Sequence, residues 1–209
     1  KGKHLITVNT EHKAVLDTFA YLETQGFEVS YLPVDAEGLI SLDQLAAALR
    51  PDTTLVSVMA VNNEIGTVQP IGEMARLLAA DPKVLLHVDA VQAFAKVPLP
   101  PHLEGIDLLS ISGHKFHGPK GTGLLFVRKG VQLEPLLAGG GQEGGLRSGT
   151  VNVPGIAAMV RAMQDSMRNL DENRRRWQEN KELLLARLEG LEGMQINGDT
   201  SMTGGAPHI

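Results

Sequence analysis

The residues with the clearest chemical potential lie in the stretch Ile106–Gly123, which reads IDLLSISGHKFHGPKGTG. An apolar run, Ile106–Ile111, ends shortly before Lys115, and a glycine-rich loop follows. A lysine held at the mouth of a sheet is partly desolvated, so its pKa falls from about 10.4 and the neutral amine can act as a nucleophile. A solvated lysine in a surface loop is the commoner situation for this residue type. Spacing alone leaves both interpretations open.

The glycines around this lysine do not form a phosphate-binding P-loop, which requires the pattern G-x-x-x-x-G-K-[ST]. Pro119 stands between Gly118 and Lys120, and Gly121 takes the place of the serine or threonine. Proline also removes an amide donor that a phosphate cradle would use. A nucleotide-binding loop is therefore excluded here.

The segment SGHKFHGPKGTG resembles the cofactor-lysine segment of the pyridoxal-phosphate (PLP) cysteine desulfurases, the IscS/NifS-like group of the class V aminotransferase fold family. Four further segments resemble signatures of that family, in its order and near its spacing: TEHKAVLDT (Thr10–Thr18), VNNEIGTVQPI (Val61–Ile71), HVDAVQ (His87–Gln92) and GGGQEGGLRSGT (Gly139–Thr150). The resemblance covers essentially the whole chain, and five ordered segments are far more specific than any single one.

The resemblance implies roles for the residues that would hold PLP. Such enzymes need a lysine that forms an aldimine with the cofactor, a carboxylate on the pyridine nitrogen, a ring-stacking group and a phosphate cradle. By the resemblance, Lys115 is the aldimine lysine, Asp89 is the carboxylate and His12 stacks on the ring. An imidazole suits stacking through its aromatic face and proton transfer through a pKa near about 6.5. Lys115 and His12 are therefore the expected catalytic residues.

The remaining contacts are assigned by the same resemblance. Asn63 and Gln92 correspond to residues that bind the substrate or cofactor and the ring hydroxyl. Ser112 and His114 correspond to phosphate ligands beside the lysine. Thr150 corresponds to a residue that reaches the phosphate of the partner subunit's cofactor, which implies a homodimer with its sites at the interface.

The residue types alone also allow structural roles for two of these side chains. Asp89 fits the cap of a helix or turn, and His12 fits a histidine at a helix start with its imidazole satisfied. One departure from the family lies at Gly144, where its members commonly have arginine. This departure concerns the detail of the loop and leaves the cofactor assignment in place.

The resemblance implies an enzyme that converts L-cysteine to L-alanine and passes the sulfur as a persulfide to acceptor or iron–sulfur scaffold proteins. The alternatives are another class V enzyme, either an aminotransferase or a selenocysteine lyase, and a truncated, non-catalytic homologue that acts as a binding subunit. The chain contains no cysteine. We therefore expect the nucleophilic thiolate, an upstream phosphate loop and the substrate-binding arginine to lie outside these residues, which would form an internal portion of the family's chain.

Composition excludes several other classes of protein. The 209 residues suffice for a sizeable core, and 43% hydrophobic with 21% charged residues is ordinary for a globular protein. A formal net charge of −5 argues against a nucleic-acid partner. No apolar run approaches the ~20 residues of a membrane span. Without cysteine there is no disulfide and no thiolate metal site, and no metal is expected. These features permit a reducing compartment, and we expect the cytoplasm.

The elements that must position these residues alternate between strand and helix, which predicts an α/β fold with a mainly parallel sheet. Five strands are expected as near-continuous apolar runs, typical of a sheet covered on both faces; they span His4–Val8, Phe27–Val34, Leu55–Val61, Val84–Val88 and Ile106–Ile111, and Leu124–Val127 follows as a sixth. The resemblance implies the large domain of PLP fold type I, with a seven-stranded type of sheet. Ligands of such sheets bind outside the carboxyl ends of the strands, so Asn63, Asp89 and Lys115 should converge.

Helices are predicted between these strands and after them. Thr10 is the expected cap of the first helix and Ser41 that of a short helix over Leu42–Leu49, while Pro70 opens a third. Pro154 is expected to begin one long helix that runs to about Leu191. We expect a PLP-binding large domain over residues 1–150, without its N-terminal part, and the linking helix with the start of a small C-terminal domain over 151–209.

Overall fold

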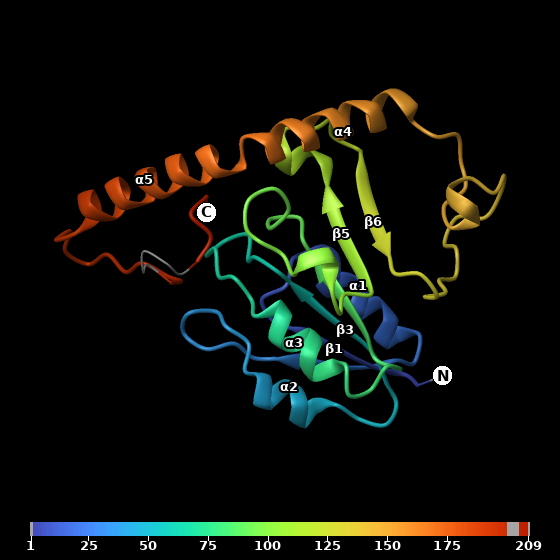
Figure 1. Ribbon diagram of the computed structural model, residues 1–209. Coiled ribbons are helices and arrows are strands. Elements are labelled where there is room, and N and C mark those ends of the chain that lie inside the picture. The colour runs from blue at the N-terminus through green and yellow to red at the C-terminus, as the bar shows by residue number, and fades with distance from the viewer. Residues whose placement is uncertain (1, 200–204, 209) are drawn as a thin grey trace.

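A computed structural model describes residues 2–199 and 205–208, and in this part of the chain six strands form one sheet (Figure 1). The strand order is β2-β1-β3-β4-β5-β6. The strands are β1 (His4–Val8), β2 (Glu28–Leu32), β3 (Thr53–Met59), β4 (Leu85–Asp89), β5 (Leu108–Ser112) and β6 (Gly123–Val127). The first five pair in parallel, and β6 is antiparallel to β5. The predicted mainly parallel α/β fold is confirmed, with six described strands where the resemblance implied seven.

The central strands are buried on both faces, which explains their near-continuous apolar sequences. All five residues of β1 are buried, and Val56, Val58, Leu86 and Val88 have essentially no exposed surface. The helices that cover the sheet are α1 (Lys13–Thr24), α2 (Leu42–Ala48) and α3 (Ile71–Leu78). Figure 1 shows α2 and α3 together on the near face and α1 behind the strands. Right-handed crossovers between parallel strands produce this arrangement.

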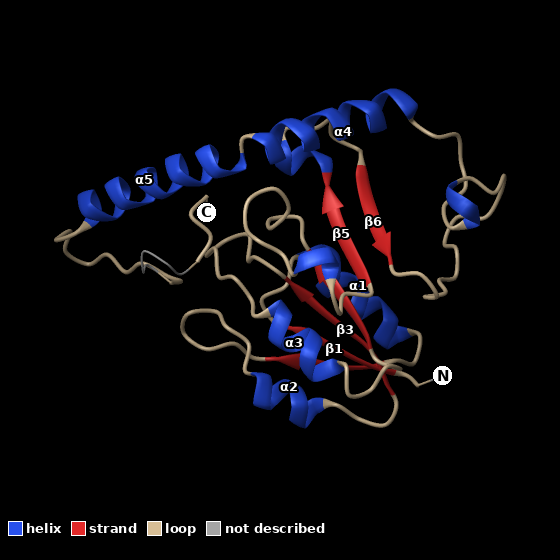
Figure 2. Cartoon of the chain, viewed as in Figure 1, coloured by secondary structure: helices blue, strands red, loops and turns tan. Residues whose placement is uncertain are grey.

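The long helix predicted from Pro154 to about Leu191 is wrong in one respect, because it is broken. The structure has α4 (Val153–Arg168) and α5 (Leu170–Leu188), with Asn169 between them at φ −100° and ψ 13° (Figure 2). The Asn169 amide donates to Asp165 and Met167 carbonyls and thereby ends α4. Asparagine has a low helix propensity, and acidic residues in the first turn of α5 favour a new helix start there.

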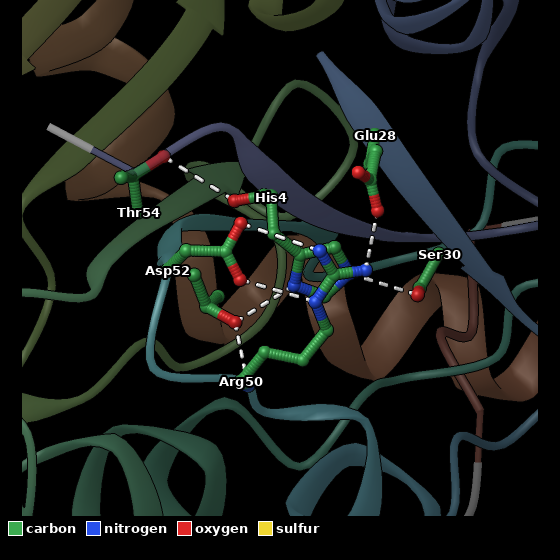
Figure 3. Close-up of polar contacts among 7 residues, drawn as sticks. His4, Glu28, Ser30, Arg50, Asp52 and Thr54 are labelled. Carbon is green, nitrogen blue, oxygen red and sulfur yellow. Dashed lines mark hydrogen bonds and ion pairs between the residues drawn. The ribbon is translucent and has the colours of Figure 1, made fainter.

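The amino ends of the strands carry a polar cluster, shown in Figure 3, that lies at the sheet edge opposite to the predicted site. His4 begins β1, and its ring nitrogens contact Thr53 Oγ1 at 2.7 Å and Ser30 Oγ at 2.9 Å. Arg50 forms an ion pair with Glu28 at 2.7 Å. Burial, together with the charge of Arg50, lowers the pKa of His4. We interpret this cluster as structural, because it ties the starts of three strands together.

Candidate active site

Four loops meet at the carboxyl edge of the parallel strands. Asp89 ends β4, and the strand register places it beside Met59 of β3 and Ser110 of β5. The carboxyl ends of β1, β3, β4 and β5, together with the loops that follow them, carry the predicted residues. These are, respectively, His12, Asn63, Asp89 with Gln92, and Ser112 with His114 and Lys115. The structure thus places seven of the eight predicted residues at this edge, the position where ligands of open α/β sheets bind.

The loops after β1 and β3 are joined by a buried asparagine that sequence reasoning did not select. Asn62 Nδ2 donates to the Thr10 carbonyl at 2.9 Å, and its Oδ1 accepts from the Glu64 and Ile65 amides. The second pair of bonds is an Asx turn, a geometry that the sequence N-N-E-I permits. Asn63, the predicted ligand, is the half-buried residue inside this turn, so its position is fixed by its neighbour.

His12, and not Thr10 as predicted, caps α1. The helix begins at Lys13, two residues later than a cap at Thr10 would place it, and His12 Nδ1 accepts from the Ala14 amide at 3.1 Å. This ring nitrogen satisfies a helix amide that would otherwise be unpaired. With Nδ1 occupied as an acceptor, the neutral imidazole carries its proton on Nε2. The exposed ring is thereby held in one orientation at the edge of the sheet.

Asp89 caps the turn after β4, which is the structural role that its residue type allowed. Its Oδ1 accepts from the Val91 amide at 2.9 Å and so caps the turn after β4. Among the described residues, no hydrogen-bond partner contacts its Oδ2. Two residues earlier on the strand, His87 bridges Ser57 at 2.8 Å and Ser110 at 2.9 Å. These hydrogen bonds connect β3, β4 and β5 two residues before Asp89. Burial lowers the pKa of His87.

Lys115 lies on a single 3-10 turn, η2 (Gly113–Phe116), directly after β5. The turn is anchored from two directions: the Phe116 ring packs on Phe94 with centroids 5.2 Å apart, and Ser166 of α4 donates to the Phe116 carbonyl at 3.3 Å. The Lys115 side chain itself is exposed. The backbone beneath the lysine is therefore held firmly, while the amine remains accessible.

The two predicted phosphate ligands flank this turn. Ser112 Oγ and His114 Nδ1 contact each other at 2.8 Å, so both polar groups lie next to Lys115. Gly113 between them is buried, and a Cβ there would lie 2.6 Å from Thr122 Oγ1 and 3.1 Å from Met159 Cγ. The glycine lets α4 and the β5–β6 connection approach the turn closely.

A second lysine, Lys96, lies near Lys115 and was not predicted. Its Nζ donates to Gln92 Oε1 at 2.8 Å. Burial, and then the positive charge of Lys115, lowers the pKa of Lys96 to about 8. The spacing Q-x-x-x-K is the only trace of this pair in the sequence, because its significance depends on a half-buried environment that spacing does not reveal.

Glu11 is a further unpredicted member of the edge. Its side chain is 5% exposed, its Oε1 accepts from the Met59 amide, and its Oε2 is buried without a hydrogen-bond partner among the described residues. Burial raises the pKa of Glu11 to about 8, with a further contribution from the charge of Asp89, while the Met59 amide opposes the shift. At neutral pH this carboxyl is therefore mostly protonated.

Thr150 is the one predicted residue that the chain does not bring to this edge. It is exposed in the connection between β6 and α4, residues 128–152, which Figure 1 shows on the side of β6 away from β5. The glycine-rich segment over residues 139–149 contains one short 3-10 turn, η3 (Glu143–Gly145). Within it, Gly144 has φ 63°. That left-handed conformation suits glycine better than the arginine common in the resembled family.

Within residues 2–199 and 205–208, no group of three histidine, cysteine or acidic side chains is arranged to hold a metal ion. No helix within the same ranges combines the length and the apolar character that crossing a membrane requires.

Comparison with known proteins gives consistent matches. The profile of the Aminotransferase class-V family matches residues 1–205. The chain is 48% identical over 198 residues to the cysteine desulfurase IscS of Methanosarcina thermophila, covering 95% of this chain and 49% of that protein. It is 50% identical over 204 residues to the IscS of Neisseria meningitidis, covering 95% and 50%. The chain thus spans about half the length of these curated relatives.

Solved structures give the same result. A NifS-like protein superimposes with a TM-score of 0.93 at 43% identity, covering 99% of this chain and 56% of that one. SspA in complex with cysteine superimposes with a TM-score of 0.75 at 46% identity, covering 78% of this chain and 47% of that one.

Proposed function

Because the chain belongs to the aminotransferase class-V family, we propose that the protein is a PLP-dependent cysteine desulfurase. PLP is the cofactor of this family. The observation that carries the proposal is the set of chemically distinct side chains at one sheet edge, with Lys115 exposed on a firmly anchored turn. The chain is 48% and 50% identical to two cysteine desulfurases, which favours this reaction over the others of the family.

The side chains at this edge fit PLP because several of them retain unused bonding capacity. PLP presents an aldehyde, a ring nitrogen, a ring hydroxyl and a phosphate. The chain offers the exposed Lys115 amine, Asp89 Oδ2 and the Gln92 amide NH₂, none of which has a hydrogen-bond acceptor or donor partner among the described residues. Ser112 and His114 add paired polar groups beside the lysine. The donor set therefore matches the groups of the cofactor.

Each residue then has a role that follows from its chemistry. Lys115 would hold the aldehyde end of PLP through Nζ, and the same amine would carry a proton to or from the substrate. Asp89 would hold the protonated ring nitrogen through its Oδ2. His12 would lie against the ring and would offer Nε2 for proton transfer. When bound, PLP supplies an electron-accepting ring for the electron pair released at the substrate's α-carbon.

The substrate we propose is L-cysteine, and the products are L-alanine and a persulfide. The sulfur leaves the substrate when a thiolate attacks it, since the thiolate is the reactive form. The 209 residues contain no cysteine, so this thiolate comes from outside them. Sulfur then passes to acceptor or iron–sulfur scaffold proteins. Thiol chemistry of this kind needs a reducing compartment, and we propose the cytoplasm.

The test is to treat the PLP-loaded, full-length protein with borohydride and map the labelled peptide. We expect label on Lys115, and we expect Lys115→Ala to lose the covalent label and all alanine and sulfide production from L-cysteine. Lys120→Ala is the matched control, because Lys120 is an exposed lysine of the same loop. Label on Lys120, or desulfurase activity in Lys115→Ala, would overturn the assignment.

A further inference from the structure

We propose that Lys96 is a positioning residue that orients the side-chain amide of Gln92, so that Gln92 Nε2 remains a hydrogen-bond donor for the cofactor's ring hydroxyl. This inference rests on the proposed function, because it concerns how the PLP site is held. It assigns a role to a residue outside the predicted set.

The backbone brings the two side chains together. Residues 90–97 form successive tight turns after β4, in which the Phe94 amide donates to the Ala90 carbonyl at 2.8 Å and the Val97 amide to the Ala93 carbonyl at 3.0 Å. Residues four apart on such turns lie on one side, and Lys96 Nζ is 2.8 Å from Gln92 Oε1.

This segment cannot shift freely. Ala93, Ala95 and Val97 are buried, and the Phe94 ring packs against Phe116 of the lysine-bearing turn. The separation between the Gln92–Lys96 pair and Lys115 is therefore set by packing and not by the two flexible side chains.

The chemistry of the contact determines which way the amide faces. An ammonium group is a donor without acceptor capacity, so the atom that it contacts must be the Gln92 carbonyl oxygen. The NH₂ group of Gln92 then points away from Lys96, and no acceptor among the described residues occupies it. Without Lys96, the oxygen and the NH₂ group could exchange places. The oxygen would then face a ring hydroxyl whose ionised form is also an acceptor.

A competing explanation is that Lys96 acts directly through its charge. Among the described residues, the groups that interact with Lys96 are Gln92, Lys115 and His208. Burial first, and the charge of Lys96 second, lower the pKa of His208 to about 4. A direct charge effect does not require Gln92. Positioning acts only through Gln92, and this difference makes the two explanations separable.

The experiment is a double-mutant cycle on the full-length protein, with the PLP dissociation constant of the apoprotein as the first readout. We expect Lys96→Met to weaken PLP binding roughly three- to tenfold, the equivalent of one hydrogen bond. In a Gln92→Ala background, the same substitution should have no further effect. Lys96→Arg, which retains a charged donor, should stay within about twofold of the wild type. An equal loss in both backgrounds would overturn the proposal.

The second readout is the pH midpoint of the visible absorption of bound PLP. Lys96→Met and Gln92→Ala should move this midpoint in the same direction, and the double variant should move it no further. Additive shifts would also contradict positioning. Lys96→Leu is made in parallel, so that poor folding of one variant does not prevent the test. If the wild type binds no PLP, the proposed function itself fails; a normal wild type with additive effects removes only the role of Lys96.

Discussion

Glu11 and Asp89 show how one sheet edge gives two carboxyl groups different environments. Asp89 is half-buried and accepts a hydrogen bond from the Val91 amide. Glu11 is enclosed, has one amide donor and leaves Oε2 without a partner among the described residues. Burial of a carboxyl disfavours its charged form. Glu11 consequently adds no full negative charge beside Asp89 at neutral pH, although the two lie close enough to interact.

This difference predicts a specific pH dependence of stability. The pKa of Glu11 is about 8 in the folded protein and 4.5 without the fold, so the folded state binds more protons between these values. The free energy of unfolding should therefore fall as pH rises, by at most about 1.4 kcal/mol per pH unit. Glu11→Gln removes this contribution. The measurement is denaturant unfolding of the apoprotein at pH 5 and pH 8. The free energy of unfolding of the variant relative to that of the wild type should be more than about 1 kcal/mol higher at pH 8 than at pH 5.

The comparison with the wild type cancels the titration of the histidines, which both proteins share. Glu64→Gln serves as the control, since Glu64 is an exposed carboxyl of the neighbouring loop. Parallel pH profiles of Glu11→Gln and the wild type would show that the Glu11 carboxyl is charged in the folded protein.

At the scale of elements, the turn that carries Lys115 is held between β5, α4 and the loop after β4. The chain leaves this turn through His117, at φ 68°, and then Gly118, whose amide donates to the Gly113 carbonyl at 2.9 Å. This hydrogen bond closes the turn. A Cβ on Gly118 would lie 2.9 Å from the Gly113 oxygen and 3.2 Å from its carbonyl carbon. Both are backbone atoms, which cannot move aside as a flexible side chain would.

Gly118→Ala should therefore displace the lysine-bearing turn. We expect a loss of about 1–3 kcal/mol in the free energy of unfolding, typical of overpacking, and a weaker affinity for PLP. Gly72→Ala in α3 is the matched control, because a Cβ there meets no atom within 4 Å and alanine favours a helix over glycine. Wild-type stability and PLP affinity in Gly118→Ala would mean that the turn relaxes without cost.

At the scale of the whole molecule, the predicted site is divided between one cluster and one distant loop. Seven predicted residues lie at the carboxyl edge of the parallel strands, whereas Thr150 lies in the exposed connection before α4. That connection also exposes large apolar side chains, with Leu136 95% exposed and Leu137 48% exposed. Exposed apolar surface of this kind marks interaction sites. We propose that a second subunit covers it and that Thr150 serves the partner's cofactor.

A shared site makes cofactor binding depend on dimerisation. In the full-length protein, Thr150→Ala should weaken PLP binding several-fold, in line with the loss of a hydrogen bond to a charged group. The PLP dissociation constant should also rise when dilution produces monomers, as followed by sedimentation velocity. Thr24→Ala, at the exposed end of α1, should change neither quantity. An unchanged PLP affinity in a monomeric form would contradict the shared site.

Sequence alone determined the parallel α/β sheet, because fully buried strands must be apolar along their whole length. It also located helix signals that depend on near neighbours in the chain. Ser41, for example, caps α2 by accepting from the Gln44 amide. The candidate cofactor residues were found for the same reason: each lies within a short segment whose residue types and order are characteristic, and seven of them converge because carboxyl ends of parallel strands share an edge.

Only the tertiary structure decided what depends on contacts between distant segments. His12 caps α1 in place of Thr10, and Asn169 divides the long helix. Glu11 becomes a buried acid because the β3 backbone covers it, and Lys96 becomes a partner of Gln92 in a half-buried site near Lys115. Desolvation is a property of everything packed around a group, so it is absent from local spacing. That is why these two unpredicted residues emerged only once the chain was folded.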